Sequence, residues 1–279
     1  MKLFECKDAP IRVFGLMNFY KNGSMMRLPE EMMEKMPQLR QFGSRSTGGR
    51  LGFRTNTKNL YVKLVTKTFI RDAFITQASS SGLDIYKGDR TKGVFIGTVF
   101  ATGARDTDPN VSEKTFSLDG EMTDITIYMP KNEILDNIYI GIDDDAVIEA
   151  PTPYRNEKPV IFYGSSITEG GCAGRVGNAY NAALSRQLNM DYINFGFSGS
   201  AKGEPEMAEF MQISGFKIIK KQKRDIKIKL KRLISFFTPS PMNYFIKNFL
   251  TAAAVIFQNT LNDSNSLFRN AKSLFFQLL

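Results

Sequence analysis

Residues 160–171 constrain the fold of this chain most strongly. Residues 160–163 are four apolar residues in a row, which suits a strand that is covered on both faces. Residues 164–171 hold three glycines and two serines, and glycine lets a backbone turn tightly and approach a ligand closely. The segment therefore predicts a buried strand, a glycine-serine turn and the start of a helix.

A second strand and a second glycine turn follow this segment. Residues 178–189 fit a helix with inward alanines, and residues 192–195 fit a second apolar strand. Residues 196–200 then form another glycine-containing turn. The strands of a strand-helix-strand unit run parallel, so both turns should lie at the carboxyl edge of the sheet, where open α/β folds bind ligands.

The first 150 residues are typical of an all-β domain. Apolar residues alternate with polar or aromatic ones in three runs, at residues 60–64, 125–128 and 138–142. Such period-two runs predict half-buried strands of an antiparallel sheet. Shorter strands are predicted at residues 83–86 and 94–100, and a short helix at residues 30–36. Many short strands separated by turn residues favour a β-sandwich or jelly roll.

Two blocks of the chain carry a family resemblance. Gly164–Thr168 resembles the first block of the SGNH (GDSL-type) hydrolases, with Ser165 in place of the usual Asp. Asn194–Gly199 resembles the second block. The wider run from residue 163 to 209 is similar to the SGNH domain of two-domain bacterial hydrolases that carry a β-sandwich in front.

The N-terminal part resembles that preceding sandwich. The likeness is carried by residues 27–30, 46–55 and 139–143. With the later blocks, the resemblance covers roughly residues 8–211. It implies an N-terminal all-β sandwich, jelly-roll-like, followed by an α/β SGNH domain of flavodoxin-like type.

The predicted organisation has four parts. A β-sandwich domain spans residues 1–149, and a linker spans residues 150–159, where three prolines preclude a helix. An incomplete SGNH domain spans residues 160–211, because only the first two of the five parallel strands that the family implies are recognisable. Residues 212–279 form a basic tail for which no fold is predicted.

The resemblance implies a serine esterase. Ser166 takes the nucleophile position, and the backbone amides of Ser166 and Gly199 take two oxyanion-hole positions. A serine hydroxyl needs a base, which in this family comes from an Asp-x-x-His motif. The sequence contains no histidine, and the block that supplies a third oxyanion donor, an Asn, cannot be matched. We therefore expect an impaired enzyme, or pseudoenzyme, of a family that would act on an acylated carbohydrate or a small ester.

Other roles for these residues stay open. Ser166 could instead cap its helix, since serine is favoured there. Three residues could be considered as substitute bases, namely Glu169, Lys202 and Glu204, but none matches the family's base position. Cys172 also lacks a histidine partner, and we expect it to be a buried or half-buried thiol.

Two groups of charged residues, three aspartates at residues 143–145 and the pair Arg50 and Arg54, each allow two interpretations. Residues 143–145 are three consecutive aspartates, which suit either a cation site or a solvated turn. Arg50 and Arg54 share one face if their segment is a strand. They could bind an acidic or sugar group, but surface ion pairs are the favoured expectation.

Composition limits the cellular setting. The two cysteines give no disulfide framework, and the first eight residues have no apolar run of signal-peptide length, so a cytoplasmic location is expected. An acyl-serine route implies no cofactor and no metal. No run of 18 apolar residues occurs, so no transmembrane segment is expected. The substrate would be a small-molecule or carbohydrate ester; the oligomeric state is not predicted.

The net charge of +9 comes from the tail. Residues 212–279 hold 12 basic and 2 acidic side chains, whereas residues 1–211 hold 25 and 26. The tail could associate with an anionic membrane or with nucleic acid. The first 211 residues have no excess of positive charge that would indicate specific nucleic-acid binding. We favour the hypothesis that a shifted reading frame encodes the tail, because the resemblance stops abruptly near residue 211.

A remaining rival function for the chain is that of a non-catalytic protein whose β-sandwich binds a glycan.

Overall fold

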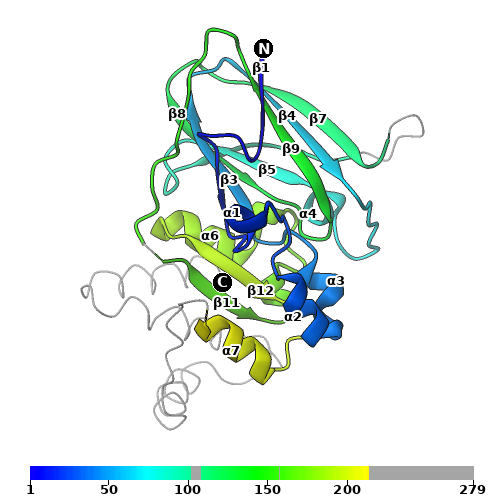
Figure 1. Ribbon diagram of the computed structural model, residues 1–279. Helices are drawn as coiled ribbons and strands as arrows, with labels where there is room; N and C mark the ends of the chain where they lie inside the picture. The colour runs from blue at the N-terminus through cyan, green and yellow to red at the C-terminus, as the bar shows by residue number, and fades with distance from the viewer. Residues whose placement is uncertain (102–107, 157, 214–279) are drawn as a thin grey trace, which may run out of the picture. The chain divides into compact units, whose positions relative to one another are not determined.

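The computed structural model describes residues 1–101, 108–156 and 158–213. Our predictions for the basic tail fall outside this part of the chain from residue 214 onward. Residues 1–207 form one compact unit. Most of its regular structure is β-sheet, with a few short helices (Figure 1).

Two antiparallel sheets account for the N-terminal part (Figure 1). The first has the strand order β1-β9-β4-β7 and consists of β1 (Lys2–Glu5), β4 (Asn59–Thr66), β7 (Val111–Ser117) and β9 (Leu135–Ile142). The second has the order β10-β3-β8-β5-β6, with β2 paired to β3. Its strands are β2 (Arg12–Phe14), β3 (Arg50–Thr55), β5 (Leu83–Lys87), β6 (Val94–Val99), β8 (Thr123–Tyr128) and β10 (Ile148–Glu149).

The predicted strands are confirmed, and their alternation builds one shared core. In β4, Leu60 and Val62 are fully buried, whereas Tyr61 and Lys63 between them are partly exposed. Inward side chains from both sheets meet in a single hydrophobic cluster, which contains Leu51, Phe53, Val62, Leu64, Ile125, Ile127, Ile138 and Ile140. Removal of this apolar surface from water is the main stabilising contribution to this half.

Five short helical segments connect these strands. They are α1 (Phe19–Asn22), α2 (Glu30–Lys35), the 3-10 helix η1 (Pro37–Leu39), α3 (Arg40–Gly43) and α4 (Gln77–Ser80). The helix predicted at residues 30–36 is therefore confirmed as α2, and Pro29 precedes it in an extended conformation. Proline there cannot continue a helix backward but fits its start.

The strand-helix-strand unit is also present. β11 (Val160–Gly164) and β12 (Tyr192–Gly196) pair in parallel, with Val160 opposite Tyr192. Within the described ranges this sheet has two strands. Its helical segments are α5 (Ser166–Glu169), η2 (Val176–Asn178), α6 (Tyr180–Leu188) and α7 (Pro205–Ile213). The helix predicted at 178–189 is thus α6, shortened at its start by the 3-10 turn.

The outward face of the second sheet is buried at β5 and β8, contrary to the expectation for β8. The alternation at residues 125–128 predicted one exposed face, yet Thr126 and Tyr128 are only 6% and 3% exposed. The neighbouring strand β5 shows why, because its Asp84 accepts a hydrogen bond from the Gly177 amide at 2.8 Å. The guanidinium of Arg186 lies 5.4 Å from the Tyr128 ring centroid. Segments η2 and α6 therefore cover this face.

Arg50 also differs from its expected role. Arg50 and Arg54 do share the outward face of β3, and Arg54 forms the expected surface ion pair with Glu149 at 3.1 Å. The Arg50 side chain, however, is fully buried and pairs with Asp191. The prediction of a surface position for Arg50 is wrong because β12 packs over this residue. The Arg50 guanidinium lies 3.9 Å from the Tyr192 ring centroid and donates to the Tyr192 carbonyl at 3.1 Å.

The aspartate run at residues 143–145 is organised by hydrogen bonds. The Asp143 carboxylate accepts from the backbone amides of Lys58 and Asn59 at 2.8 and 2.9 Å and from the Thr57 hydroxyl at 2.8 Å. Hydrogen bonds from the Asn59 side chain and amide come first among the causes that lower the pKa of Asp143 to about 2. Asp143 thus joins the end of β9 to the start of β4.

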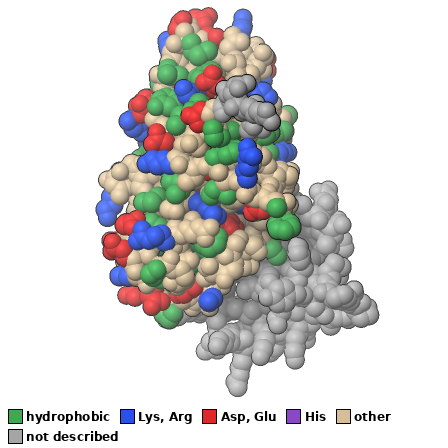
Figure 2. All heavy atoms as spheres, turned by 90° about the vertical axis from the view of Figure 1, so that its right-hand side faces the viewer, with side chains coloured by type: hydrophobic (Ala, Val, Ile, Leu, Met, Phe, Trp, Pro, Cys, Tyr) green, Lys and Arg blue, Asp and Glu red, His purple; other side chains and the backbone are tan. Residues whose placement is uncertain are grey.

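The described part was compared with three expectations, on surface charge, on membrane-spanning helices and on metal sites. On the face drawn in Figure 2, acidic and basic side chains are interspersed, in keeping with the near-neutral balance of residues 1–211. Among the residues that the structure describes, no helix has the length and apolarity needed to cross a bilayer. The same portion has no group of three or more Cys, His, Asp or Glu side chains placed to hold a metal.

We expect Asp143→Asn to lower stability at neutral pH, because only a carboxylate accepts all of these bonds strongly. The folded-state pKa lies below the unfolded value, so the contribution is present above about pH 4 and is lost as the pH falls through about 2. Thermal unfolding of the wild type and the variant between pH 7 and pH 2 measures this. A difference in melting temperature that stays constant over that range would contradict the assignment.

We expect Arg50→Met to reduce the free energy of unfolding by about 3–5 kcal/mol, because it leaves Asp191 largely buried without its cation. Arg54→Met is the matched control, since a surface ion pair contributes about 0–1 kcal/mol. Urea unfolding of both variants measures the difference. Equal losses in the two variants would mean that Arg50 is not a buried structural cation.

Candidate active site

Ser166 lies at the start of α5, directly after the end of β11. It is the first residue of the helix, and Ser165 before it is extended, with φ −87° and ψ −152°. Ser166 is exposed, and within the described residues its hydroxyl makes no hydrogen bond. The N-cap of the helix is Ser165, whose side chain makes no capping hydrogen bond. The alternative role as a helix cap is therefore not the role of this hydroxyl, which is free to meet a ligand.

Gly199 lies in the turn after β12. It is exposed, and its φ of +69° is in the left-handed region that favours glycine. The amide of Phe197 donates to the Gly164 carbonyl at 2.8 Å and so fixes this turn to the end of β11. The structure thus brings the two predicted turns to one edge of the sheet. In the described ranges, neither the Ser166 amide nor the Gly199 amide has a hydrogen-bond acceptor.

Close packing of α5 on β12 depends on Gly196. A Cβ atom added at Gly196 would lie 2.0 Å from the Glu169 amide nitrogen and 2.5 Å from the Glu169 Cα atom. No side chain can be accommodated at such distances. The absence of a side chain at Gly196 therefore lets the C-terminal end of α5 rest directly on the strand.

Glu169, one of the considered bases, is already occupied. Its carboxylate pairs with Arg27 at 2.8 Å, and both side chains are at most 3% exposed. It also accepts hydrogen bonds from the Ser198 hydroxyl and, at 3.3 Å, from the Ser198 amide. Burial lowers the pKa of Arg27 to about 10, and the Glu169 charge opposes that shift. Glu169 is therefore a structural anion rather than a free base.

None of the other three residues with a suggested role is hydrogen-bonded to the Ser166 hydroxyl within the described part. Glu204 accepts from the Tyr163 hydroxyl at 2.6 Å; burial and this contact raise the pKa of Tyr163 to about 12. Lys202 is exposed and donates its amide to Glu204. Cys172 is exposed, so the expectation of a buried or half-buried thiol is wrong. No carboxylate or amine in the described ranges is hydrogen-bonded to the Ser166 hydroxyl.

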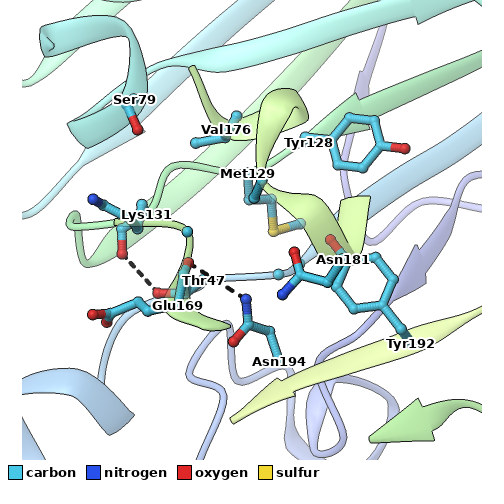
Figure 3. A pocket seen from close by; sticks show the side chains of 14 residues that line it. Thr47, Ser79, Tyr128, Met129, Lys131, Glu169, Val176, Asn181, Tyr192 and Asn194 are labelled. Atoms are coloured by element: carbon cyan, nitrogen blue, oxygen red, sulfur yellow. Dashed lines mark hydrogen bonds between the residues drawn. The ribbon is translucent and has the colours of Figure 1, made fainter. Parts of the chain in front are cut away.

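A small cavity lies between the antiparallel sheets and the parallel unit and is lined by residues of both (Figure 3). Its volume is about 20 Å³, enough for one water molecule. The buried Ser79 hydroxyl lines the cavity and has no partner in the described residues. Across from it lie Asn181 and Asn194, from α6 and β12. Ser166 does not line this cavity, so it is not the substrate pocket.

The structural roles of three residues near the site were not predicted from the sequence. Arg27 and Asp84 come from the N-terminal part, and Asn194 comes from β12. The Asn194 side chain accepts from the Gly196 amide at 2.8 Å and donates to the Glu169 carbonyl at 3.5 Å. The sequence holds no signal for the burial of Asp84, because a charged residue between Leu83 and Ile85 fits the outward position of a half-buried strand.

Comparison with known proteins places the chain in a family. Residues 1–148, more than half of the chain, match the family described as the N-terminus of SGNH hydrolase-type esterases. Residues 157–217 match the GDSL-like lipase/acylhydrolase family. The chain therefore belongs to the SGNH-type esterases that carry this N-terminal domain. No curated protein matches it.

The first family's short name, GxDLY, spells Gly-x-Asp-Leu-Tyr, and residues 82–86 read Gly-Leu-Asp-Ile-Tyr. In the structure, Asp84 of this segment pairs with Arg175 at 3.3 Å in addition to binding the Gly177 amide. Burial raises the pKa of Asp84, and these hydrogen bonds and the Arg175 charge oppose the shift. The segment thus joins β5 to the loop that follows α5.

Two solved structures share the fold. One is a Bacteroides ovatus protein described as a GDSL-like lipase, with 26% identity and a TM-score of 0.65 over 75% of this chain and 60% of that one. The other is the salicylyl-acyltransferase SsfX3 from a tetracycline biosynthetic pathway, with 18% identity and a TM-score of 0.57 over 76% and 58%. The chain thus spans about 60% of the length of these relatives.

We expect Gly196→Ala to reduce the free energy of unfolding by at least about 1–3 kcal/mol, because the new methyl group forces α5 away from β12. Gly174→Ala is the control, since a Cβ there meets nothing within 4 Å and its φ is not positive. Chemical unfolding of both variants measures the effect. If the two alanine variants are equally stable, α5 does not pack as described.

Proposed function

We propose that this chain is an SGNH-type serine esterase whose acyl-transfer chemistry is impaired. Ser166 would attack the ester carbonyl, and the amides of Ser166 and Gly199 would stabilise the oxyanion. The observation that supports the proposal is the free hydroxyl of Ser166 at the carboxyl edge of β11, at the same sheet edge as the Gly199 turn, with neither the Ser166 nor the Gly199 amide bound to an acceptor within the described residues.

Impairment follows from the missing base. The 279 residues contain no histidine, and the nearest carboxylate in the sequence, Glu169, is neutralised by Arg27. Loss of a triad member lowers turnover by roughly 10⁴- to 10⁶-fold, whereas oxyanion stabilisation and binding still leave roughly 10³- to 10⁴-fold over water. We therefore infer a residual rather than an efficient esterase.

The substrate we infer is an acylated carbohydrate or a similar small ester. The exposed position of Ser166 supports it, since an ester on a larger alcohol can reach the hydroxyl without entering a deep pocket. The accompanying architecture would be a jelly-roll-like sandwich built from the two antiparallel sheets, with an incomplete α/β domain after it. The glycan-binding and tail-mediated functions remain rival predictions.

A fluorophosphonate probe with added imidazole tests this function. The probe forms a covalent adduct with an activated serine, and free imidazole supplies the base that the chain lacks. We expect slow labelling of the wild-type chain alone and at least about tenfold faster labelling with imidazole. Peptide mapping should place the adduct on Ser166.

The control is Ser166→Ala, which should abolish the labelling with and without imidazole. Unchanged labelling of this variant, or an adduct on another residue, would refute the assignment of the nucleophile. Rapid hydrolysis of p-nitrophenyl acetate by the wild type without imidazole would refute the impairment. An intact fold in both proteins is verified by circular dichroism.

A further inference from the structure

Arg27 contacts both turns of the candidate site from outside the α/β unit. Its guanidinium donates to the Gly196 carbonyl at 2.6 Å and to the Asn194 carbonyl at 3.4 Å, at the end of β12. A third hydrogen bond, at 2.8 Å to the Phe42 carbonyl, fixes the side chain to α3. The guanidinium also lies 4.7 Å from the Phe197 ring centroid. Arg27 is therefore held in one orientation.

Glu169 connects this arginine to the two candidate oxyanion donors. It is the last residue of the helix that Ser166 begins, so its position is tied to the Ser166 amide. One carboxylate oxygen binds Arg27, and the other accepts from both the amide and the hydroxyl of Ser198. Ser198 directly precedes Gly199. A continuous chain of hydrogen bonds therefore runs from Arg27 through Glu169 to Ser198.

We propose that Arg27 and Glu169 are positioning residues that set the separation of the Ser166 and Gly199 amides through Ser198. This inference rests on the proposed esterase function, because it concerns the oxyanion hole of that site. None of the three side chains touches the reacting atoms. Their role is to keep two separate turns in register, so that both amides can face one oxygen.

The physical reason is that little else in the described part fixes the Gly199 turn. Gly199 itself is exposed, and a Cβ at this position would meet nothing within 4 Å. The turn closes on itself through the Ser200 and Ala201 amides, which donate to the Phe197 carbonyl at 3.0 and 3.1 Å. It is joined to β11 and α5 by the Phe197 amide on the Gly164 carbonyl and by the two Ser198 bonds to Glu169. Loss of the Ser198 hydroxyl should leave the strand pairing intact but loosen the turn.

The test compares Ser198→Ala with Ser198→Thr, which retains a hydroxyl donor. We expect Ser198→Ala to lower the rate of imidazole-assisted labelling of Ser166 by about tenfold to 10²-fold, since small displacements of catalytic groups have effects of this size. We expect Ser198→Thr to restore most of the rate. Arg27→Lys should behave like Ser198→Ala, because lysine cannot reproduce the fork of donors. Arg54→Met is the unaffected control.

Hydrogen–deuterium exchange gives a second measurement that does not depend on the reactivity of Ser166. We expect faster exchange of amides in residues 197–200 in Ser198→Ala and Arg27→Lys, with β4 and β11 unchanged. If the wild type is not labelled even with imidazole, the proposed function fails, and the exchange data alone decide the positioning role. Exchange and labelling in Ser198→Ala equal to those of the wild type would overturn the inference.

Discussion

The outer edge of β12 is the feature on which the α/β unit depends. One edge of this strand pairs with β11, and along the other the carbonyls of Tyr192, Asn194 and Gly196 need donors. Arginines of the N-terminal part supply them, Arg50 at the start of the strand and Arg27 at its end. A buried carbonyl without a donor is costly, so these two side chains replace the neighbouring strand that a larger sheet would offer.

Burial of two guanidinium groups requires two buried anions, and these shape the site. Asp191 balances Arg50 just before β12, and Glu169 balances Arg27 at the end of α5. Two charges taken from water are tolerated only when their geometry and hydrogen bonds are good. The pairing with Arg27 therefore holds Glu169 in place at the end of the helix that Ser166 begins. The same ion pair occupies one oxygen of the Glu169 carboxylate.

Sequence reasoning succeeded where local pattern is sufficient. Period-two alternation located the core strands, and the parallel connection correctly put the Ser166 and Gly199 turns at one edge of the sheet. It failed for the outward faces of β3, β5 and β8. The alternation of a strand states which side chains share a face, but it does not state what covers that face. Arg50 was therefore expected at the surface, although β12 buries it completely.

The sequence by itself determined the chemistry that is available: a serine in a glycine-rich turn, an unmatched oxyanion block and no histidine among 279 residues. Those are properties of composition and short spacing, which need no coordinates. Only the tertiary structure decided which charged groups meet, because Arg27 and Glu169 are 142 positions apart in the chain. Such a contact depends on how two sheets pack, and no local pattern encodes it.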